Sequence, residues 1–183
     1  MELSRKTKAA LWWQKRVRRK QGRKQSLISV SEGDSIKKIF ICLPDHRRDY
    51  DFVLRFLKSV DNALGPNPGK NILYLGLTKA RAGMGLEMKN ESFLYTPQEL
   101  NSFGLPAKPL LERAALIKTD MVLDLNPEFS PVTASLSLFI EAPFKVGFYS
   151  EENKDYYNIL LRKRGNDLID SGFKELHQLL GIK

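Results

Sequence analysis

The chain contains short continuous apolar runs separated by segments with helical spacing. Residues 37–43 and 71–77 are runs rich in β-branched and aromatic side chains, which is typical of buried strands. Between them Phe52, Phe56 and Val60 recur at the spacing of one helix face. The pattern predicts a strand, helix, strand unit, whose connection joins two parallel strands by a crossover.

A second unit of the same kind follows in the later half of the chain. Residues 120–125 and 144–148 are apolar runs that predict strands, and residues 131–141 between them predict an apolar helix. Ser130 is a well-suited N-cap for this helix, and Pro131 occupies its first position. Two such units indicate a doubly wound sheet.

Weaker patterns fill the remaining sequence. We expect short strands at residues 93–95 and 156–162, and helices at residues 97–103, capped by Thr96, at 109–117 and at 166–180. The fold class predicted from the sequence is therefore α/β. We expect residues 36–183 to form a single Rossmann-like three-layer domain with a mostly parallel sheet.

The first 25 residues differ in character from this domain. Residues 1–25 form a basic helical arm in this prediction: residues 3–24 are strong helix formers with no proline, and Leu3, Ala10, Trp13 and Val17 recur on one face of an amphipathic helix. Leu11 and Trp12 widen that apolar stripe. The serine-containing residues 26–35 then predict a linker between the helical arm and the domain.

The net charge of +9 resides entirely in this arm. Residues 1–25 contain ten Lys or Arg and one acid, and the rest of the chain contains twenty of each sign. Three interpretations stay open: the helix docks on its own domain through Trp12 or Trp13, lies on an anionic membrane, or binds RNA phosphates. A protein partner is a further alternative. The candidate residues for an anionic surface are Trp12, Trp13, Lys15, Arg16, Arg18, Arg19, Lys20, Arg23 and Lys24.

Several classes of protein are disfavoured by what the sequence does not contain. One cysteine, Cys42, rules out a disulfide framework, and two distant histidines give no metal-ligand cluster. There is no run of roughly 18–20 apolar residues and no signal-peptide pattern. The glycines of residues 65–70 and 83–85 match neither a phosphate loop nor a dinucleotide fingerprint, and we interpret them as a turn and a flexible loop. We expect a cytoplasmic protein, free or peripheral at the inner membrane surface, with no integral membrane segment, metal or cofactor.

The candidate functional residues follow two of the predicted strands. Ligands of open α/β sheets bind beyond the carboxyl ends of the strands, so the loops after Leu43 and Leu125 are the places to examine. The alternative is ordinary turn and cap chemistry, which we rank ahead of catalysis. The candidates are Asp45, Asp49 and Asp51 as bases, and Arg47, Arg48, Asp124, Asn126 and Ser130 as ligand-binding residues.

Residues 120–131, DMVLDLNPEFSP, and residues 142–148, APFKVGF, resemble the N-terminal domain of lipopolysaccharide heptosyltransferases. That family has a "D-x-V-x-D-L" strand, a helix and then "A-P-x-R-x-G-F". The resemblance implies an acceptor-side Rossmann-like domain, with Asp49 nearest to the position of the family's aspartate base. The family's "S-x-G-D" turn is replaced here by residues 44–49, and its second, donor-binding domain has no counterpart. We therefore expect a binding or accessory module that is not catalytic alone, and otherwise an inverting sugar transfer.

Over nearly the whole chain the sequence is similar to a small family of uncharacterised bacterial proteins. Its features are a lysine-rich N-terminal helix, an "F-G-[IL]-P" turn, present here as Phe103–Pro106, and "K-V-G-x-Y-x-E-E-N-K", present as Lys145–Lys154. This similarity supports the fold and names no ligand. The alternative function is an RNA-associated protein whose basic arm contacts phosphates.

Overall fold

A computed structural model describes residues 4–20, 36–64, 71–87 and 91–161. Within these ranges a six-stranded sheet has the order β3-β2-β1-β4-β5-β6, and every neighbouring pair is parallel. This arrangement confirms the predicted Rossmann-like α/β class. The strands are β1 (Lys38–Cys42), β2 (Asn71–Leu77), β3 (Phe93–Tyr95), β4 (Met121–Asp124), β5 (Phe144–Phe148) and β6 (Ile159–Leu161).

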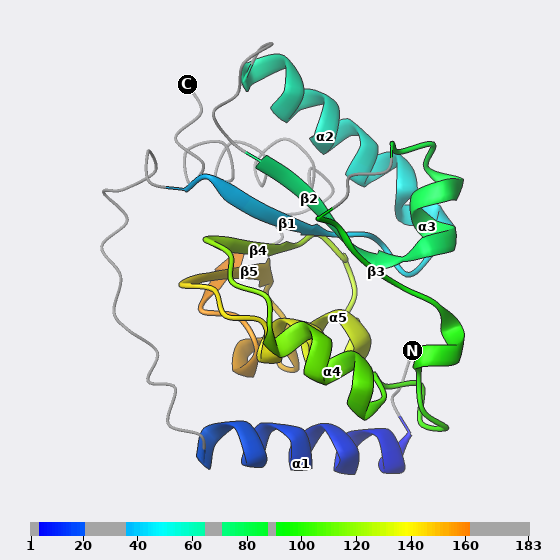
Figure 1. The fold of residues 1–183 in the computed structure, drawn as a ribbon, viewed down its shortest axis with the longest axis vertical. Helices are drawn as coiled ribbons and strands as arrows, with labels where there is room; N and C mark the ends of the chain where they lie inside the picture. Colours follow the sequence, from blue (N-terminus) through cyan, green and yellow to red (C-terminus); the bar gives the residue numbers. More distant parts are fainter. Residues whose placement is uncertain (1–3, 21–35, 65–70, 88–90, 162–183) are drawn as a thin grey trace.

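Helices cover both faces of the sheet (Figure 1). The α2 and α3 helices lie on one side, and α4 and α5 lie on the other. The described α-helices are α1 (Arg5–Lys20), α2 (Tyr50–Leu64), α3 (Thr78–Gly83), α4 (Lys108–Ala115) and α5 (Pro131–Phe139), and the 3-10 helices are η2 (Arg47–Asp49), η3 (Pro97–Glu99) and η4 (Asn153–Asp155). None of the helices in the described ranges is long and apolar enough to cross a bilayer.

The apolar runs of the strands supply a core on each face of the sheet. Along β1, Ile39 and Ile41 pack on the side of α2, and Phe40 and Cys42 pack on the side of α4 and α5. Successive side chains of a strand point to opposite faces, so a strand buried on both faces needs apolar residues at every position. This requirement explains why β1 has no alternation of apolar and polar residues.

Local signals predicted helix starts and the short strands β3 and β6 well, and the short helices poorly. The Ser130 side chain accepts a hydrogen bond from the Thr133 amide at 3.2 Å, as expected of an N-cap. Thr96 and Glu99 form a capping box, but only the three residues of η3 follow instead of a helix to residue 103. The helix α3 was not predicted, and Gly83 ends it where we expected a flexible loop. The predicted turn at 65–70 and helix at 166–180 lie outside the described residues.

The basic helix α1 packs on α5. Its Leu11 is only 5% exposed and joins a core cluster with Leu105, Ala134 and Tyr156. The prediction that Trp12 or Trp13 makes this contact is wrong, because their exposed fractions are 56% and 62%. Polar contacts add to the packing: Gln14 hydrogen-bonds Ser135, and Lys15 Nζ lies 2.8 Å from Asp155 Oδ2.

Candidate functional site

The site begins at the point where the strand order reverses. From β1 the chain proceeds to β2 and β3 on one side, and it then returns to place β4 on the other side of β1. The loops after β1 and β4 therefore leave the sheet in opposite directions, and the crevice between such loops is where doubly wound proteins bind ligands. Cys42 and Asp124, the last residues of the two strands, are partners in register. This is the location predicted from the sequence.

Two hydrogen bonds join the loops. The Asp45 amide donates to Asn126 Oδ1 at 3.1 Å, and Arg48 NH2 donates to Glu128 Oε1 at 2.5 Å. The first bond is partly buried and the second is exposed to solvent. The two polar clusters found in the sequence thus meet in one place.

Asp124 is the centre of a buried hydrogen-bond network. Its Oδ1 accepts from the Asn126 amide at 2.9 Å and from Asn126 Nδ2 at 2.8 Å. Its Oδ2 accepts from the hydroxyl of Thr133 at 2.6 Å and from the hydroxyl of Tyr157. A carboxylate has about four lone-pair positions, so this set of donors engages all of them. Asp124 therefore organises the loop and the start of α5, and has no acceptor left for a ligand.

Sequence reasoning missed two members of this network, Thr133 and Tyr157. Thr133 is recognisable afterwards as the residue three positions after the N-cap Ser130. The signal for Tyr157 is Gly147, because a Cβ at this glycine would lie 2.8 Å from the tyrosine ring. Burial, with the charge of Asp124 as a second cause, raises the pKa of Tyr157 well above its ordinary value, so its hydroxyl stays protonated and donates.

Asp45 differs from Asp124 in its surroundings. Burial raises the pKa of its carboxyl above the ordinary value, and a hydrogen bond with Ser130 opposes that change. The neighbouring Asp124 raises it further, and His46 lowers it. A half-enclosed carboxyl with a raised pKa beside a crevice has the properties of a proton acceptor or of a hydroxyl-binding group.

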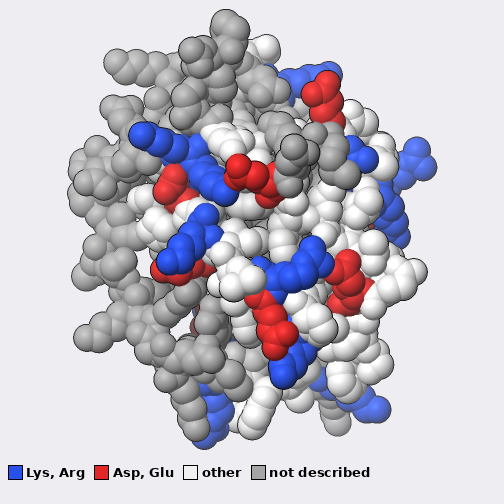
Figure 2. Space-filling model, in the orientation of Figure 1, with Lys and Arg blue, Asp and Glu red and all other residues white. Residues whose placement is uncertain are grey.

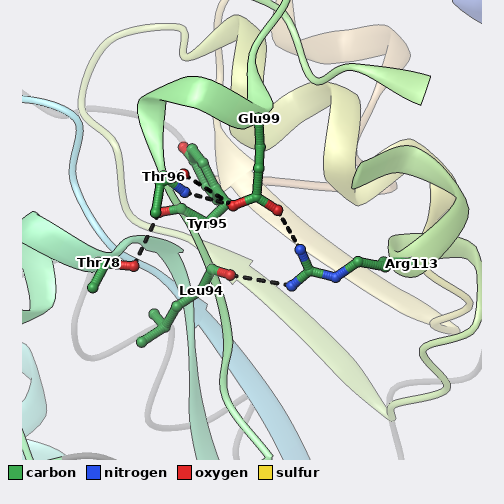
Figure 3. A network of polar contacts seen from close by, with 6 residues as sticks. All are labelled: Thr78, Leu94, Tyr95, Thr96, Glu99 and Arg113. Atoms are coloured by element: carbon green, nitrogen blue, oxygen red, sulfur yellow. Dashed lines mark hydrogen bonds and ion pairs between the residues drawn. The ribbon is translucent and has the colours of Figure 1, made fainter. Parts of the chain in front are cut away.

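Tyr95 borders the same region from the end of β3. Burial is the main cause that raises its pKa, and Asp45 is the second. A polar network holds this end of the strand (Figure 3): Thr78 Oγ1 donates to the Tyr95 carbonyl at 3.1 Å, and Arg113 bonds both Glu99 and the Leu94 carbonyl. The backbone at the end of β3 is therefore held by contacts to α3 and α4.

The other predicted candidates lie near Asp45 with different contacts. Asp49 is mostly buried and lies 3.8 Å from Arg48 Nε, while Asp51 is exposed in the first turn of α2. Arg47 and Arg48 are exposed at the mouth of the site. Of the three candidate bases, Asp45 is the one with hydrogen bonds to the loop after β4. In the described part of the chain, no three His, Cys, Asp or Glu side chains gather as a metal site.

The docking of α1 places the cations predicted for an anionic surface in different environments. Lys15 is engaged by Asp155 and lies 4.3 Å from the ring centre of Tyr156, whereas Arg16 stacks over Trp12 at 5.2 Å. In Figure 2, red and blue residues alternate over the middle of the face, and the lowest charged residues, near α1, are blue. The remaining candidates lie where the side chains are not described: Arg18, Arg19, Lys20, Arg23 and Lys24.

Comparisons with known proteins give one match. A search of curated proteins and a search of solved structures found no protein similar to this chain. A family model matches residues 10–182, a range that includes all six strands and α1 from Ala10 onward. The chain therefore belongs to that family, which is described as a family of unknown function (DUF6913).

Proposed function

We propose that the chain is a binding or accessory module, related to the acceptor-side domain of heptosyltransferase-like glycosyltransferases, that holds a hydroxyl-rich ligand at the switch point. The observation that carries this proposal is the hydrogen bond from the Asp45 amide to Asn126, which brings both candidate loops together. Beside it, the Asp45 carboxyl is the group with acceptor capacity that the Asp124 network leaves available.

The chemistry of the crevice suits a sugar with a negative group. A carboxyl and a serine hydroxyl, from Asp45 and Ser130, are partners for sugar hydroxyls, and the exposed guanidinium groups of Arg47 and Arg48 favour a phosphate or carboxylate nearby. Arg48 already bonds Glu128, so a ligand anion would compete with that exposed pair. Such a competition costs little, because exposed ion pairs contribute little stability.

We propose binding without catalysis by this chain alone. In an inverting sugar transfer a base takes the proton of the acceptor hydroxyl, and Asp45 is best placed for that role. The described residues form one Rossmann-like domain, whereas the resembling transferases bind the nucleotide sugar in a second one.

A titration with deacylated lipopolysaccharide core oligosaccharide tests the proposal. We expect changes in the amide NMR signals of Asp45 and Asn126, and roughly tenfold weaker binding by Asp45→Asn, since a hydrogen bond to a charged group contributes about 1.5–3 kcal/mol. Asp51→Asn is the matched control, because Asp51 is exposed on α2, and it should bind normally. Signals that stay unchanged around β1 and β4 would overturn the proposal, and sugar transfer by the isolated chain would overturn its non-catalytic part.

We also propose that α1 attaches the module to an anionic membrane. Its docked position leaves Trp12 and Trp13 exposed together with Lys8 and Arg16. Two exposed tryptophans flanked by cations are typical of helices at a membrane interface. Neighbouring residues point about 100° apart around a helix, so both rings can enter a shallow apolar layer more readily than they can stack on successive RNA bases.

Tryptophan emission distinguishes the two partners, because Trp12 and Trp13 are the only tryptophans. We expect a blue shift with phosphatidylglycerol vesicles, reduced in both Trp12→Ala and Trp13→Ala. Quenching by RNA that disappears at high salt, with no response to vesicles, would replace this proposal by the RNA alternative. Tyr149→Phe, which changes an exposed side chain outside α1, is the control.

A further inference from the structure

A groove of about 740 Å³ lies between α1 and the loop that contains η4. Its volume falls in the range of roughly 300–1,000 Å³ that is usual for small-molecule sites. One wall is the stripe of Lys8, Trp12 and Arg16, which recur every four residues and so lie along one side of α1. The opposite wall is residues 151–156. The groove is separate from the crevice between β1 and β4.

The base of the groove is apolar. Leu11 is buried there, and the rings of Phe129 and Tyr156 lie 5.7 Å apart at a tilt of 45°. Trp12 forms the rim and is 56% exposed. A ligand that enters the groove therefore meets aromatic and aliphatic surface below and a tryptophan at the edge.

Some of the charges along the groove are already neutralised. Lys15 bridges to Asp155 at 2.8 Å across the two walls, and Glu151 accepts from Lys154 at 2.7 Å and from the Tyr149 hydroxyl at 2.8 Å. The Lys15–Asp155 pair joins the two walls, and the contacts of Glu151 lie within one wall. Lys15, Asp155 and Glu151 are therefore already paired, and fewer charged groups in the groove are available to a ligand.

Three charges in the groove have no ion pair within the described part of the chain: Lys8 and Arg16 on α1, and Glu152 on the opposite loop. Arg16 stacks on the face of Trp12, which leaves the edge of its guanidinium group free to donate to an anion. The groove thus presents cations on one wall and a carboxylate on the other. A simple anion would meet repulsion from Glu152, and a simple cation would meet repulsion from Lys8 and Arg16.

We propose that this groove binds the headgroup of a membrane phospholipid that carries both a phosphate and a primary ammonium group. The phosphate pairs with Arg16, the ammonium group pairs with Glu152, and the glycerol portion lies on the apolar base, while Lys8, two turns away on the same wall, adds positive charge that attracts the anionic membrane. The proposal rests on the proposed membrane attachment of α1. Trp12 and its exposed neighbour Trp13 are the reason to commit to a lipid, because they place the mouth of the groove at the membrane interface.

The test compares vesicles that differ in one headgroup. Phosphatidylethanolamine and phosphatidylcholine are each mixed with the same fraction of phosphatidylglycerol, so that surface charge is equal. A primary ammonium group donates up to three hydrogen bonds and a trimethylammonium group donates none. We expect about tenfold tighter binding to the ethanolamine vesicles, which corresponds to about 1.4 kcal/mol.

Variants of the full chain locate the effect. Glu152→Gln should remove the preference for ethanolamine while binding to phosphatidylglycerol persists, and Lys8→Glu should weaken binding to both vesicles. Glu87→Gln alters an exposed carboxylate outside the groove and should keep the preference. All three residues are exposed, so the variants are expected to fold.

The outcomes separate this inference from the membrane attachment on which it rests. Equal binding to both kinds of vesicle, or a preference that survives Glu152→Gln, overturns the headgroup site and leaves the attachment standing. Absence of binding to any vesicle overturns the attachment. In that case, glycerophosphoethanolamine that still shifts the NMR signals of residues 151–156 would show a site for a soluble compound and overturn the lipid as its source.

Discussion

The loops after β4 and β1 contain similar residues and behave differently. At the end of β4, Asp124 is buried and accepts four hydrogen bonds, two of them from Asn126 in the loop that follows. After β1, Asp45 is half-buried, and its carboxyl has a raised pKa. An aspartate at or just after the end of a parallel strand is therefore a structural group when donors surround it, and it is available to a ligand when they do not.

The same hydrogen bonds imply that the loop after β4 is more rigid than the loop after β1. The network of Asp124 ties β4 to α5 through Thr133 and to the segment before β6 through Tyr157. The loop of Asp45 is then held against this rigid part by its bond to Asn126. One loop is therefore a support, and the other is the part that it positions. Variants of the two aspartates and of their partners test this difference.

Replacement of Asp124 should have the largest effect. In Asp124→Ala the Thr133 and Tyr157 hydroxyls and the Asn126 side chain lose their acceptor inside the protein, and buried donors without partners are expensive. We expect the free energy of unfolding to fall by about 3–5 kcal/mol, measured by denaturant unfolding. Asp51→Ala should change it by less than about 0.5 kcal/mol. A loss of similar size in the two variants would contradict the assignment of roles.

Removal of one donor should have an intermediate effect. Tyr157→Phe deletes the hydroxyl that donates to Asp124 Oδ2 and leaves that oxygen with Thr133 alone. We expect a loss of about 1–3 kcal/mol in the free energy of unfolding. Tyr149→Phe removes the same atom from an exposed tyrosine that bonds Glu151, and it serves as the matched control. Equal stability of the two variants would show that the buried network contributes nothing.

Asp45 should influence the dependence of stability on pH. Because its pKa is raised in the folded state, the native protein binds more protons than the unfolded chain at pH values between the ordinary aspartate pKa of about 3.9 and the folded pKa. The free energy of unfolding therefore falls as pH rises through that interval. Asp45→Asn lacks this loss, so it should gain stability relative to the unmodified protein as pH rises from 4 to 7. A constant difference over this range would contradict the raised pKa.

The smallest effect is expected at the mouth of the site. Arg48 bonds Glu128 in solvent and is the main cause that holds the pKa of Glu128 below its ordinary value. Arg48→Ala should raise that pKa toward the ordinary value, as measured by NMR titration, and should leave the unfolding midpoint unchanged. A clear fall in the midpoint would show that this surface bond belongs to the structural network.

Much of the fold could be predicted from the residues themselves. The strands β1, β2, β4 and β5 are short, mostly apolar runs, which are typical of a sheet buried on both faces. The helix α3 could not be predicted, because its six residues have little apolar pattern and Ala80 alone is buried in the core. Its existence depends on tertiary packing, which local propensity does not contain.

The place of the candidate site could be predicted from the sequence, but the roles of its residues could not. The rule for parallel sheets predicts the loops after β1 and β4, but it does not tell which aspartate is surrounded by donors. That depends on Tyr157, which is 33 positions away from Asp124 in the chain. The docking of α1 shows the same limit. Leu11, Trp12 and Trp13 are adjacent, and only the facing surface of α5 decides that Leu11 is buried.

The packing of α1 has a consequence for how the chain is made. Lys15 meets Asp155, which is 140 positions later. At about 5–20 residues per second, the ribosome delivers that partner roughly 7–30 s after Lys15. A helix of 16 residues is only marginally stable by itself. During this interval Leu11 is exposed in the nascent chain together with both tryptophans, because the residues that bury Leu11 have not yet been synthesised. The many Lys and Arg residues around them keep this segment soluble until the sheet and α5 have formed.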